Sequence, residues 1–538
     1  MTMAISRKYA VLGALMAGTL TFTACSGGKP GATEIKDASA DYGFQATGFP
    51  IVSKQLTLKF SGTKAALAPD YNTMTVVKNW EKDTNIHIDW QNLPDTVFQE
   101  KKNLILASGD LPDAFFNTGL TDAEIATYSA SGTLIPLEDL IAKNAPNLSK
   151  LLSARPDIKA AITSSDGHIY SLPTVEELGL VQFPNEIAIN TTWLKKLNIP
   201  MPKTISEFHD ALLAFKTKDA SGTGKTIPLS FMPDSWCGDI VDLIAALGGV
   251  PDNQDHRIVQ NGKVIFTPTH DGYKKAIQTL HQWYQEGLID PESFSQDDKA
   301  YLAKGKAATE NLGSFAWWEI PEMVGADRAT DYALTPVLQG TGGKRIASQS
   351  NNQEIARGAF AITRADKYPA ATMRWADNLY DPIQSAQANW GPIGETLQKD
   401  GATGLLTQIP ATAGTSEGER RQKVAPGGPK ANTAENFKTV VAPEPRAAER
   451  QKTVNENYKP FAGNDGYPPV ALSNDELQQI TTIQTDSASL VKQNIAKWIV
   501  SGGIEQEWDG YVAQLKNIGV DKMIEVYQQA YDRYKKNS

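Results

Sequence analysis

Two short stretches in which apolar and polar residues alternate constrain the fold of this chain most. In QLTLKF, the side chains of Leu56, Leu58 and Phe60 fall on one face of an extended strand, and NIHIDW (residues 85–90) repeats the pattern. The segment between them, residues 70–84, is long enough for a helix. A strand–helix–strand unit favours two parallel strands, because a parallel pair needs a crossover connection. The sequence therefore predicts an α/β fold.

Helical patterns follow along the rest of the chain. Residues 204–215 begin with a capping box and continue at helical spacing. An amphipathic stripe covers residues 273–284, and Gly287 is expected to end that helix. Residues 414–459 are rich in Pro, Gly, Ala and charge, which predicts an exposed, irregular excursion. The pattern is helical again over residues 477–534.

The N-terminus predicts a secretory signal peptide over residues 1–24. Arg7 and Lys8 precede an uncharged run that is shorter than the roughly 20 residues needed to cross a bilayer. The run ends in Phe-Thr-Ala-Cys, which resembles a bacterial lipobox. In such a motif the cysteine thiol, here that of Cys25, receives a diacylglycerol and the cysteine becomes the new N-terminus. We therefore expect Cys25 to carry a lipid anchor.

The residues that follow Cys25 support this interpretation. They are small and polar, and they cannot bury a core, so residues 25–48 are predicted to form a flexible tether. A plain signal peptide with an incidental cysteine is the alternative. Once Cys25 is lipidated, Cys237 is the one cysteine left in the chain, and we expect no disulfide.

Length and charge limit the remaining possibilities. A chain of 538 residues exceeds the roughly 250–300 residues at which a single core stops growing, which predicts two or three domains. The net charge of −9 and the pI near 5.4 argue against nucleic acid as a partner, because such binding needs a basic surface. No segment after the signal peptide is long and apolar enough to span a bilayer.

One glycine-rich stretch invites a nucleotide or a metal interpretation. SGTGKT (residues 221–226) ends like a phosphate-binding loop, but Asp219 stands where the first glycine belongs. The stretch also aligns with a calcium loop that starts at Asp219 and has Gly224 at its sixth position, yet Ser230 replaces the bidentate Glu. One carboxylate gives a divalent cation little charge to bind. We therefore expect a tight turn here, and neither a metal nor another cofactor; the spacing of the six histidines likewise predicts no zinc site.

Adjacent carboxylates occur twice in the chain, at Glu176-Glu177 and at Asp297-Asp298. Neighbouring side chains on a strand point to opposite faces, so adjacency does not create an acid/base pair. A glycosidase needs two carboxylates about 5–10 Å apart across a sugar, and only folding can assemble them. The sequence therefore gives no positive sign of catalysis, and we predict that the protein is not an enzyme.

Tryptophans in loop-like contexts are more informative. Trp236 lies in PDSWCGD, Trp317 and Trp318 lie in GSFAWWEIPE, and Trp390 lies in ANWGPIG. An aromatic face can stack on the C–H face of a sugar ring, while nearby polar groups select its hydroxyls. The alternative is that these tryptophans plug a domain interface. Three such stretches in one chain favour a cleft for a sugar or a peptide.

Longer motifs are spread over most of the mature chain. They are LASGDLPDAFF (106–116), GHIYSLP (167–173), INTTWLKKLNIPMPKTISEFHDALLAFK (189–216), YQEGLIDPESF (284–294), GAFAITRADKYPAATMRWADNLYD (358–381) and WIVSGGIEQEWDGYVAQLKNIGVDKMIEVYQQAYDRY (498–534). With these motifs the chain resembles the extracellular solute-binding proteins of sugar-type ABC importers, in the long lipoprotein branch common in Gram-positive bacteria.

The resemblance implies a two-lobe periplasmic-binding-protein-like α/β fold with the ligand cleft between the lobes. Lobe 1 is expected to comprise residues 49–173 with about 358–395, and lobe 2 residues 174–357 with about 396–538. Some relatives that bind acidic oligosaccharides hold calcium in a loop like 219–228, and here the acidic part of that loop is missing.

The resemblance also suggests site residues. The turn after PDAFF, the segment LPTVEELGL and the segment NLGSFAWWEI face the cleft in relatives. The candidate ligand-binding residues are Asn117, Asp122, Glu177, Phe315, Trp317 and Trp318 from the resemblance, together with Trp236 and Trp390 from their loop contexts.

The predicted function is that of a substrate-binding lipoprotein. It would capture a saccharide, most simply an oligosaccharide, and deliver it to ABC permease subunits, as a monomer anchored by lipid to the extracellular face of the cell membrane. Two alternatives stay open: a receptor for a peptide or another solute, and a surface-anchored carbohydrate-active enzyme.

Overall fold

The computed structural model describes residues 37–233, 235–352, 354–411, 417–463 and 465–538. Cys25 and the predicted signal peptide lie outside the described residues. No helix in the described part of the chain is long and apolar enough to cross a membrane.

The strands form two larger sheets and two hairpin-like pairs. Their bounds are β1 (Leu56–Lys64), β2 (Ile86–Pro94), β3 (Ala114–Phe116), β4 (Leu172–Glu176), β5 (Glu186–Asn190), β6 (Ile227–Ser230), β7 (Arg257–Gln260), β8 (Lys263–Phe266), β9 (Leu312–Trp317), β10 (Tyr332–Leu334), β11 (Ile355–Ile362), β12 (Leu397–Lys399), β13 (Leu406–Gln408) and β14 (Lys430–Asn432).

Helices occupy most of the segments between the strands. Their bounds are α1 (Thr75–Thr84), α2 (Asp95–Ser108), α3 (Asp122–Ala130), α4 (Glu138–Asn144), α5 (Pro146–Ala154), α6 (Pro156–Ile162), α7 (Thr191–Lys196), α8 (Ile205–Thr217), α9 (Val241–Gly248), α10 (Asp271–Gln285), α11 (Asp298–Gly305), α12 (Ile320–Val324), α13 (Pro369–Asn378), α14 (Pro382–Trp390), α15 (Glu417–Val424), α16 (Asn436–Thr439), α17 (Pro445–Asn457), α18 (Asn474–Ser501), α19 (Ile504–Ile518) and α20 (Val520–Asn537).

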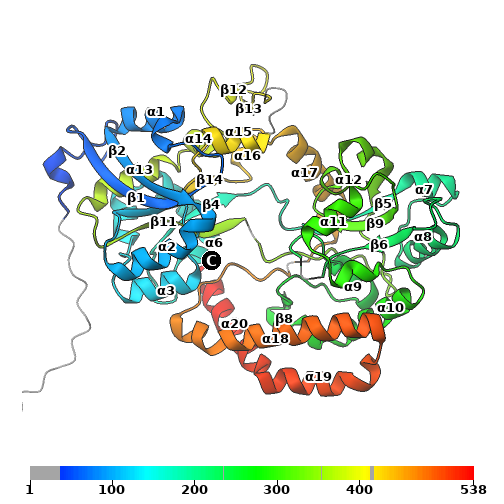
Figure 1. The fold of residues 1–538 in the computed structure, drawn as a ribbon. Helices are drawn as coiled ribbons and strands as arrows, with labels where there is room; N and C mark the ends of the chain where they lie inside the picture. The colour runs from blue at the N-terminus through cyan, green and yellow to red at the C-terminus, as the bar shows by residue number, and fades with distance from the viewer. Residues whose placement is uncertain (1–36, 234, 353, 412–416, 464) are drawn as a thin grey trace, which may run out of the picture. The chain divides into compact units, whose positions relative to one another are not determined.

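The first sheet has six strands in the order β14-β4-β11-β3-β1-β2. β1 and β2 run parallel, with Leu56 opposite Ile86 and Leu58 opposite Ile88, and α1 connects them. The predicted strand–helix–strand unit is therefore confirmed. Strands distant in sequence complete the sheet: β11 pairs with β3 and β4, and β14 pairs with β4, in the same sheet as the blue β1 and β2 of Figure 1.

The second sheet has four strands in the order β10-β5-β9-β6. α8 packs on it through Phe208, Leu212 and Phe215, which are fully buried, and the predicted capping box begins this helix. Two sheets that alternate with helices confirm the predicted α/β class. β9 pairs on both edges with β5 and β6, and it is buried along its whole length because its side chains pack into two core clusters, Ala316 in one and Leu312, Phe315 and Trp317 in the other.

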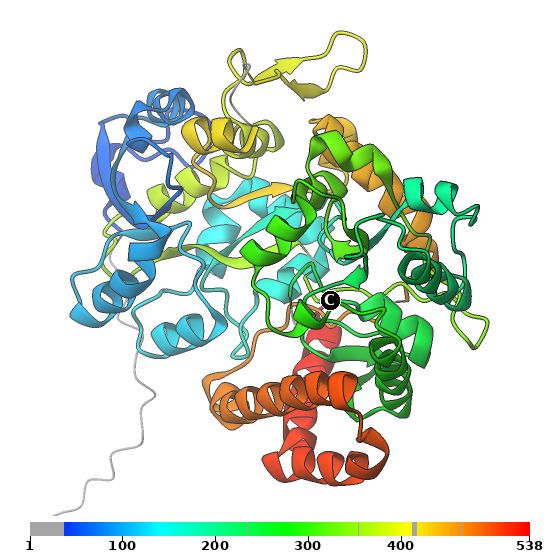
Figure 2. The ribbon, with the colours of Figure 1, turned by 45° about the vertical axis from the view of Figure 1, so that its right-hand side comes forward.

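Three helices close the chain, as the sequence predicts for residues 477–534. α18 packs against α10 and against α20, and Figure 2 shows α18 crossing in front of α20. The stripe predicted over residues 273–284 lies on α10 and is buried at Tyr273, Ile277 and Leu280. α10 ends at Gln285, and Gly287, with a φ of +66°, lies just beyond its end, as expected.

The predicted tether is wrong for residues 37–48, and residues 25–36 lie outside the described part. Ser39 is 1% exposed, and its hydroxyl accepts a hydrogen bond from the backbone N–H of Ala371 in α13. The Gly48 carbonyl accepts another from the Arg374 guanidinium. The segment is held by α13 through one side-chain and one backbone group, contacts that the composition of the segment cannot reveal.

The predicted irregular excursion over residues 414–459 is also wrong where the structure describes it. This stretch contains α15, β14, α16 and α17, and β14 pairs in parallel with β4 in the first sheet. The predicted boundary places residues from about 396 onward in lobe 2, whereas β14 belongs to the same sheet as β1 and β2. The remaining lobe boundaries stay a prediction.

Candidate functional site

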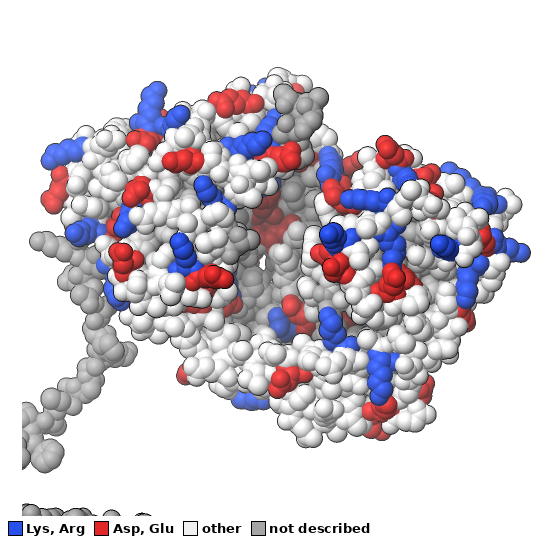
Figure 3. All heavy atoms as spheres, viewed as in Figure 1, with Lys and Arg blue, Asp and Glu red and all other residues white. Residues whose placement is uncertain are grey.

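A groove of about 750 Å³ lies where segments of both larger sheets and α17 meet. Thr174 and Glu176 of β4 contribute to one wall, together with the first residues of β11. Trp236, Trp318 and Arg450 contribute from the loop after β6, the end of β9 and α17. We call this cavity the aromatic groove. Figure 3 shows a hollow with acidic side chains on its wall.

Two tryptophans give the aromatic groove its apolar surface. Trp236 is 51% exposed. The Arg450 guanidinium lies 4.8 Å from the centroid of the Trp318 ring, and the Arg446 guanidinium lies 5.4 Å from it. A cation over an aromatic face is attracted by the quadrupole of the ring, so these arginines hold Trp318 in place. Arg446 is itself fixed by hydrogen bonds to the Glu319 carboxylate at 2.6 and 2.8 Å.

Two carboxylates supply acceptors in the same groove. Both oxygens of Glu354 accept a hydrogen bond from the backbone N–H of Gly179, each at 2.8 Å. Burial, together with the nearby carboxylates of Glu177 and Glu176, raises the pKa of Glu354 to about 7, although the backbone N–H groups oppose the rise. Glu176 accepts from the side-chain amide of Asn389 at 3.1 Å. Since carboxylates accept hydrogen bonds from hydroxyls, this wall suits a polyhydroxylated ligand.

A buried acidic group lies behind Arg450. Burial raises the pKa of Glu186 to about 8, although Arg450 opposes this rise. Within the described residues, Glu186 Oε1 and Arg450 Nε are buried without a hydrogen-bond partner. Burial also lowers the pKa of Arg450. Each of these two side chains therefore keeps one buried polar atom without a hydrogen bond, and their opposite charges attract each other.

Two further cavities continue from the aromatic groove. The first, of about 530 Å³, shares Trp236, Asn351 and Asn352 with it. In this middle section the Arg257 guanidinium lies 4.6 Å from the Tyr467 ring and 3.9 Å from the Tyr527 ring.

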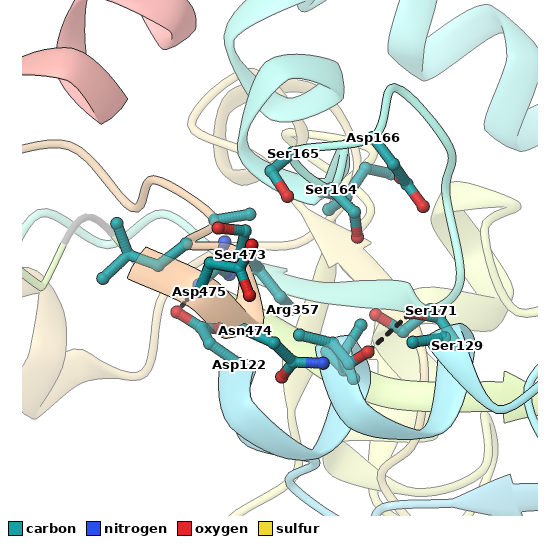
Figure 4. A pocket seen from close by; sticks show the side chains of 16 residues that line it. Asp122, Ser129, Ser164, Ser165, Asp166, Ser171, Arg357, Ser473, Asn474 and Asp475 are labelled. Carbon is teal, nitrogen blue, oxygen red and sulfur yellow. Dashed lines mark hydrogen bonds and ion pairs between the residues drawn. The ribbon is translucent and has the colours of Figure 1, made fainter. Parts of the chain in front are cut away.

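The second is a cavity of about 310 Å³ that we call the hydroxyl chamber, drawn in Figure 4. Asp122 and Arg357, which form an ion pair, line both the middle section and the hydroxyl chamber.

Three of the predicted ligand-binding residues line these cavities. Trp236 and Trp318 line the aromatic groove, and Trp236 also lines the middle section. Asp122 is the first residue of α3 and faces the other two cavities. Burial raises the pKa of its carboxyl group, while Arg357 opposes the rise.

Asn117 and Glu177 have partners within the protein. The Asn117 amide donates to the Pro426 carbonyl at 2.8 Å and accepts from the Gly428 N–H at 3.0 Å. The Glu177 carboxylate accepts from the Arg155 guanidinium at 2.7 and 2.9 Å. Neither residue is among those that line the three cavities. Their hydrogen bonds instead join Asn117 to the segment at Pro426–Gly428, and Glu177 to Arg155.

The other three predicted aromatics are buried in cores. Phe315 is 0% and Trp317 is 5% exposed in β9, where they pack on Tyr332 and Tyr301. Trp390 is 6% exposed, and its indole N–H donates to Glu444 at 3.1 Å. None of them lines the three cavities.

Several groove residues were not among the predicted ones, above all Glu176, Glu354 and Arg450. The signal for Glu176 is the adjacent pair Glu176-Glu177: successive side chains of an extended chain point to opposite faces, so only one of the two can face the groove. A signal for Glu354 existed in the polar run that starts at Asn351 and directly precedes β11. Arg450 had no such signal, because α17 is polar almost throughout.

The loop at Asp219 holds itself together. The Asp219 carboxylate accepts from the Gly224 N–H at 2.9 Å and from the hydroxyls of Ser221 and Thr226 at 3.1 and 2.8 Å. Across the described ranges, no group of three or more His, Cys, Asp or Glu side chains could hold a metal ion. The loop is therefore a closed turn built around one carboxylate.

Comparison with known proteins places the chain in a family. The family model described as bacterial extracellular solute-binding protein matches residues 64–386. FusA of Streptococcus pneumoniae, a fructooligosaccharide ABC transporter substrate-binding protein, is 37% identical over 538 residues, which cover 97% of this chain and 98% of FusA. Lipoprotein LipO of Bacillus subtilis is 27% identical over 337 residues, or 60% of this chain and 64% of LipO.

Solved structures agree with this placement. FusA in complex with kestose superposes with a TM-score of 0.78, and an EF-hand mutant of FusA in complex with fructo-nystose with 0.77; each covers 90% of this chain and 100% of the FusA chain. An extracellular solute-binding protein from Bifidobacterium longum subsp. infantis is 25% identical with a TM-score of 0.80, covering 89% of this chain and 99% of its own. The predicted two-lobe α/β fold is thereby confirmed. The chain belongs to the bacterial extracellular solute-binding proteins.

Proposed function

We propose that this protein captures a neutral oligosaccharide of the fructooligosaccharide class outside the cell and delivers it to an ABC importer. The observation that carries the proposal is the aromatic groove, in which Trp318 and Trp236 stand among the carboxylates of Glu176 and Glu354. The 37% identity to FusA, a fructooligosaccharide ABC transporter substrate-binding protein, supports the same ligand class.

The groove suits a sugar for two physical reasons. The indole faces offer apolar area to the C–H groups of a sugar ring, and burying such area is worth roughly 25 cal/mol per Å². The carboxylates and the amides of Asn351 and Asn352 can accept or donate hydrogen bonds to hydroxyls that would otherwise lose their water. The hydrogen-bonding groups therefore select the sugar by the positions of its hydroxyls, while the tryptophans contribute affinity.

Closure of the lobes would couple binding to transport. β4 and β11 belong to the six-stranded sheet, whereas Trp318 follows β9 of the four-stranded sheet, so the groove draws its walls from both sheets. A ligand that contacts both walls stabilises a closed form over an open one, and the permease subunits can then recognise the closed form.

The anchor belongs to the same proposal. Lipidation of Cys25 would attach the protein, as a monomer, to the extracellular face of the cell membrane, and the likeness to lipoprotein LipO supports this. A single acyl chain binds membranes only marginally, whereas two chains anchor stably, which suits a diacylated cysteine. Attachment also raises the effective concentration of the receptor at its permease.

Isothermal titration calorimetry of the purified protein with kestose tests the proposal. Sucrose, maltotriose and a peptide mixture serve as comparison ligands. We expect saturable heat with kestose and weaker or no heat with the others. If maltotriose or the peptides bind and kestose does not, the proposed ligand class is refuted. Thin-layer analysis of kestose after incubation addresses the enzyme alternative, since a binding protein returns the sugar intact.

A further inference from the structure

The hydroxyl chamber lies beyond the part of the groove that holds the tryptophans. α3 forms one side of it, the turn at Ser164–Asp166 forms another, and the start of α18 closes it, as Figure 4 shows. Its volume is about 310 Å³, at the lower end of the roughly 300–1,000 Å³ in which proteins hold small molecules.

The chamber borders the middle section of the groove. Asp122, Arg357 and Leu472 line both the chamber and the middle section. The middle section in turn shares Trp236 and Asn351 with the aromatic groove. The three cavities therefore follow one another, and the Asp122–Arg357 ion pair lies at the boundary between the middle section and the chamber.

The chemistry of the chamber differs from that of the aromatic groove. Five serines contribute to its lining, and none of the described residues that form its wall is aromatic. Its serines are Ser129, Ser164, Ser165, Ser171 and Ser473. Hydroxyl groups both donate and accept, as the hydroxyls of a sugar do. This wall can bind hydroxyls by hydrogen bonds but offers no ring for stacking.

The charge of the chamber points to a neutral ligand. Three aspartates, Asp122, Asp166 and Asp475, line it together with a single cation, Arg357. Since Arg357 is already paired with Asp122, two carboxylates stand without a cation among the lining residues. An anionic sugar that enters would meet like charge, which opposes binding.

We propose that the hydroxyl chamber is a distal subsite that receives the terminal unit of neutral oligosaccharides too long for the aromatic groove and the middle section. The proposal rests on the proposed function, and it adds that affinity rises with chain length. The tryptophans hold the proximal units by stacking, and the serines and aspartates of the chamber hold the terminal unit by hydrogen bonds.

A substitution that fills the chamber provides the test. Ala126 is on the face of α3 that lines the chamber, and Ala123 is exposed on the same helix outside the lining. Ala126→Phe therefore reduces the chamber, while Ala123→Phe introduces the same side chain into the same helix and serves as the matched control. Calorimetry measures kestose, fructo-nystose and a longer inulin-type oligosaccharide against the wild-type protein and both variants.

We expect the longest oligosaccharide to bind the wild type and Ala123→Phe about tenfold more tightly than kestose, equivalent to about 1.4 kcal/mol. Ala126→Phe should lose that gain while its affinity for kestose stays unchanged. An oligogalacturonide should not compete.

Each other outcome overturns a defined part of the reasoning. If kestose binds but affinity does not rise with length, or if Ala126→Phe retains the gain, the distal subsite is refuted and the proposed function stands. Tight binding of the oligogalacturonide refutes the proposed preference of the subsite for neutral sugars. If no fructooligosaccharide binds the wild type, the proposed function itself fails.

Discussion

Replacing Trp318 by alanine tests whether the aromatic groove is the place where the sugar binds. Trp318 lines the groove, and Arg450 lies 4.8 Å from its ring centroid. If the ring stacks on a sugar, Trp318→Ala removes this contact from the complex. Trp318 follows β9 and is half-buried at the edge of the core cluster that contains Phe315 and Trp317, so the substitution removes a peripheral contact and leaves the fully buried residues of that cluster in place.

The size of the effect follows from the surface that the ligand covers. Burying a large apolar side chain fully is worth about 1.5–3 kcal/mol. Trp318 is already partly covered by Arg450 and Arg446 before any ligand arrives, so the lower end of this range applies. A loss of about 1.5 kcal/mol corresponds to roughly tenfold weaker binding.

The loss of stability should be small for Trp318→Ala and large for a buried tryptophan. An exposed cation–π contact contributes about 0.5–1 kcal/mol, so loss of the arginine contacts should lower the melting temperature only slightly. Trp390→Ala is the matched comparison, since Trp390 is 6% exposed and lies outside the three cavities. Truncation of a buried tryptophan costs about 3–5 kcal/mol, which should lower the melting temperature clearly.

Calorimetry with kestose and melting curves without ligand measure both quantities on the same preparations. We expect Trp318→Ala to lose affinity and keep its stability, and Trp390→Ala to lose stability and keep its affinity where it folds. The reasoning is refuted if Trp318→Ala binds kestose like the wild type. An equal loss of affinity in both variants would instead indicate a general disturbance of the fold.

Three further predictions concern the anchor, the metal and the pH dependence. Cys25→Ala should release the protein from membranes or leave it unprocessed, and a mature N-terminus other than a lipidated Cys25, seen by mass spectrometry, would contradict the anchor. A chelator should leave the melting temperature unchanged, because the loop already satisfies the Asp219 carboxylate; a drop of several degrees that added calcium reverses would show a metal site. The pKa of Glu354 rises from its usual 4.5 to about 7, so the folded state holds the proton more tightly and the free energy of unfolding falls as pH rises between these values. Glu354→Gln should lack this pH-dependent loss of stability, which is on the order of 2–3 kcal/mol at 1.36 kcal/mol per pH unit. Chemical denaturation at pH 5 and pH 8 measures it, and we expect the variant to be more stable relative to the wild type at pH 8 than at pH 5. Equal pH dependence of the free energy of unfolding in both proteins would contradict the raised pKa of Glu354.

The sequence by itself determined the elements whose formation depends on nearby residues. Alternation in β1 and β2 predicts the strands, because the inward face must be apolar wherever a sheet covers a core, and the helix-length segment between them predicts their parallel pairing. The capping box before α8 is equally local, since its hydrogen bonds join residues three positions apart.

The segment that forms α17 shows where such local reasoning ends. α17 buries Val454 as its one buried residue, so its composition resembles that of a polar excursion. Its place is set by distant partners: Arg446 bonds to Glu319, and Arg450 stacks on Trp318. Contacts between residues more than a hundred positions apart leave no periodic trace in the sequence.

The site depended on a choice between neighbours that only the tertiary structure made. The sequence predicts Glu177 as a ligand residue, but its neighbour Glu176 lines the groove; of the two predicted tryptophans Trp317 and Trp318, only Trp318 does. Successive side chains in an extended chain point to opposite sides, so the sequence narrows the choice to two. The residue of each pair that reaches the groove is decided by the packing of its neighbour. Arg155 binds Glu177 and Tyr301 packs on Trp317, so Glu176 and Trp318 are the residues that line the groove.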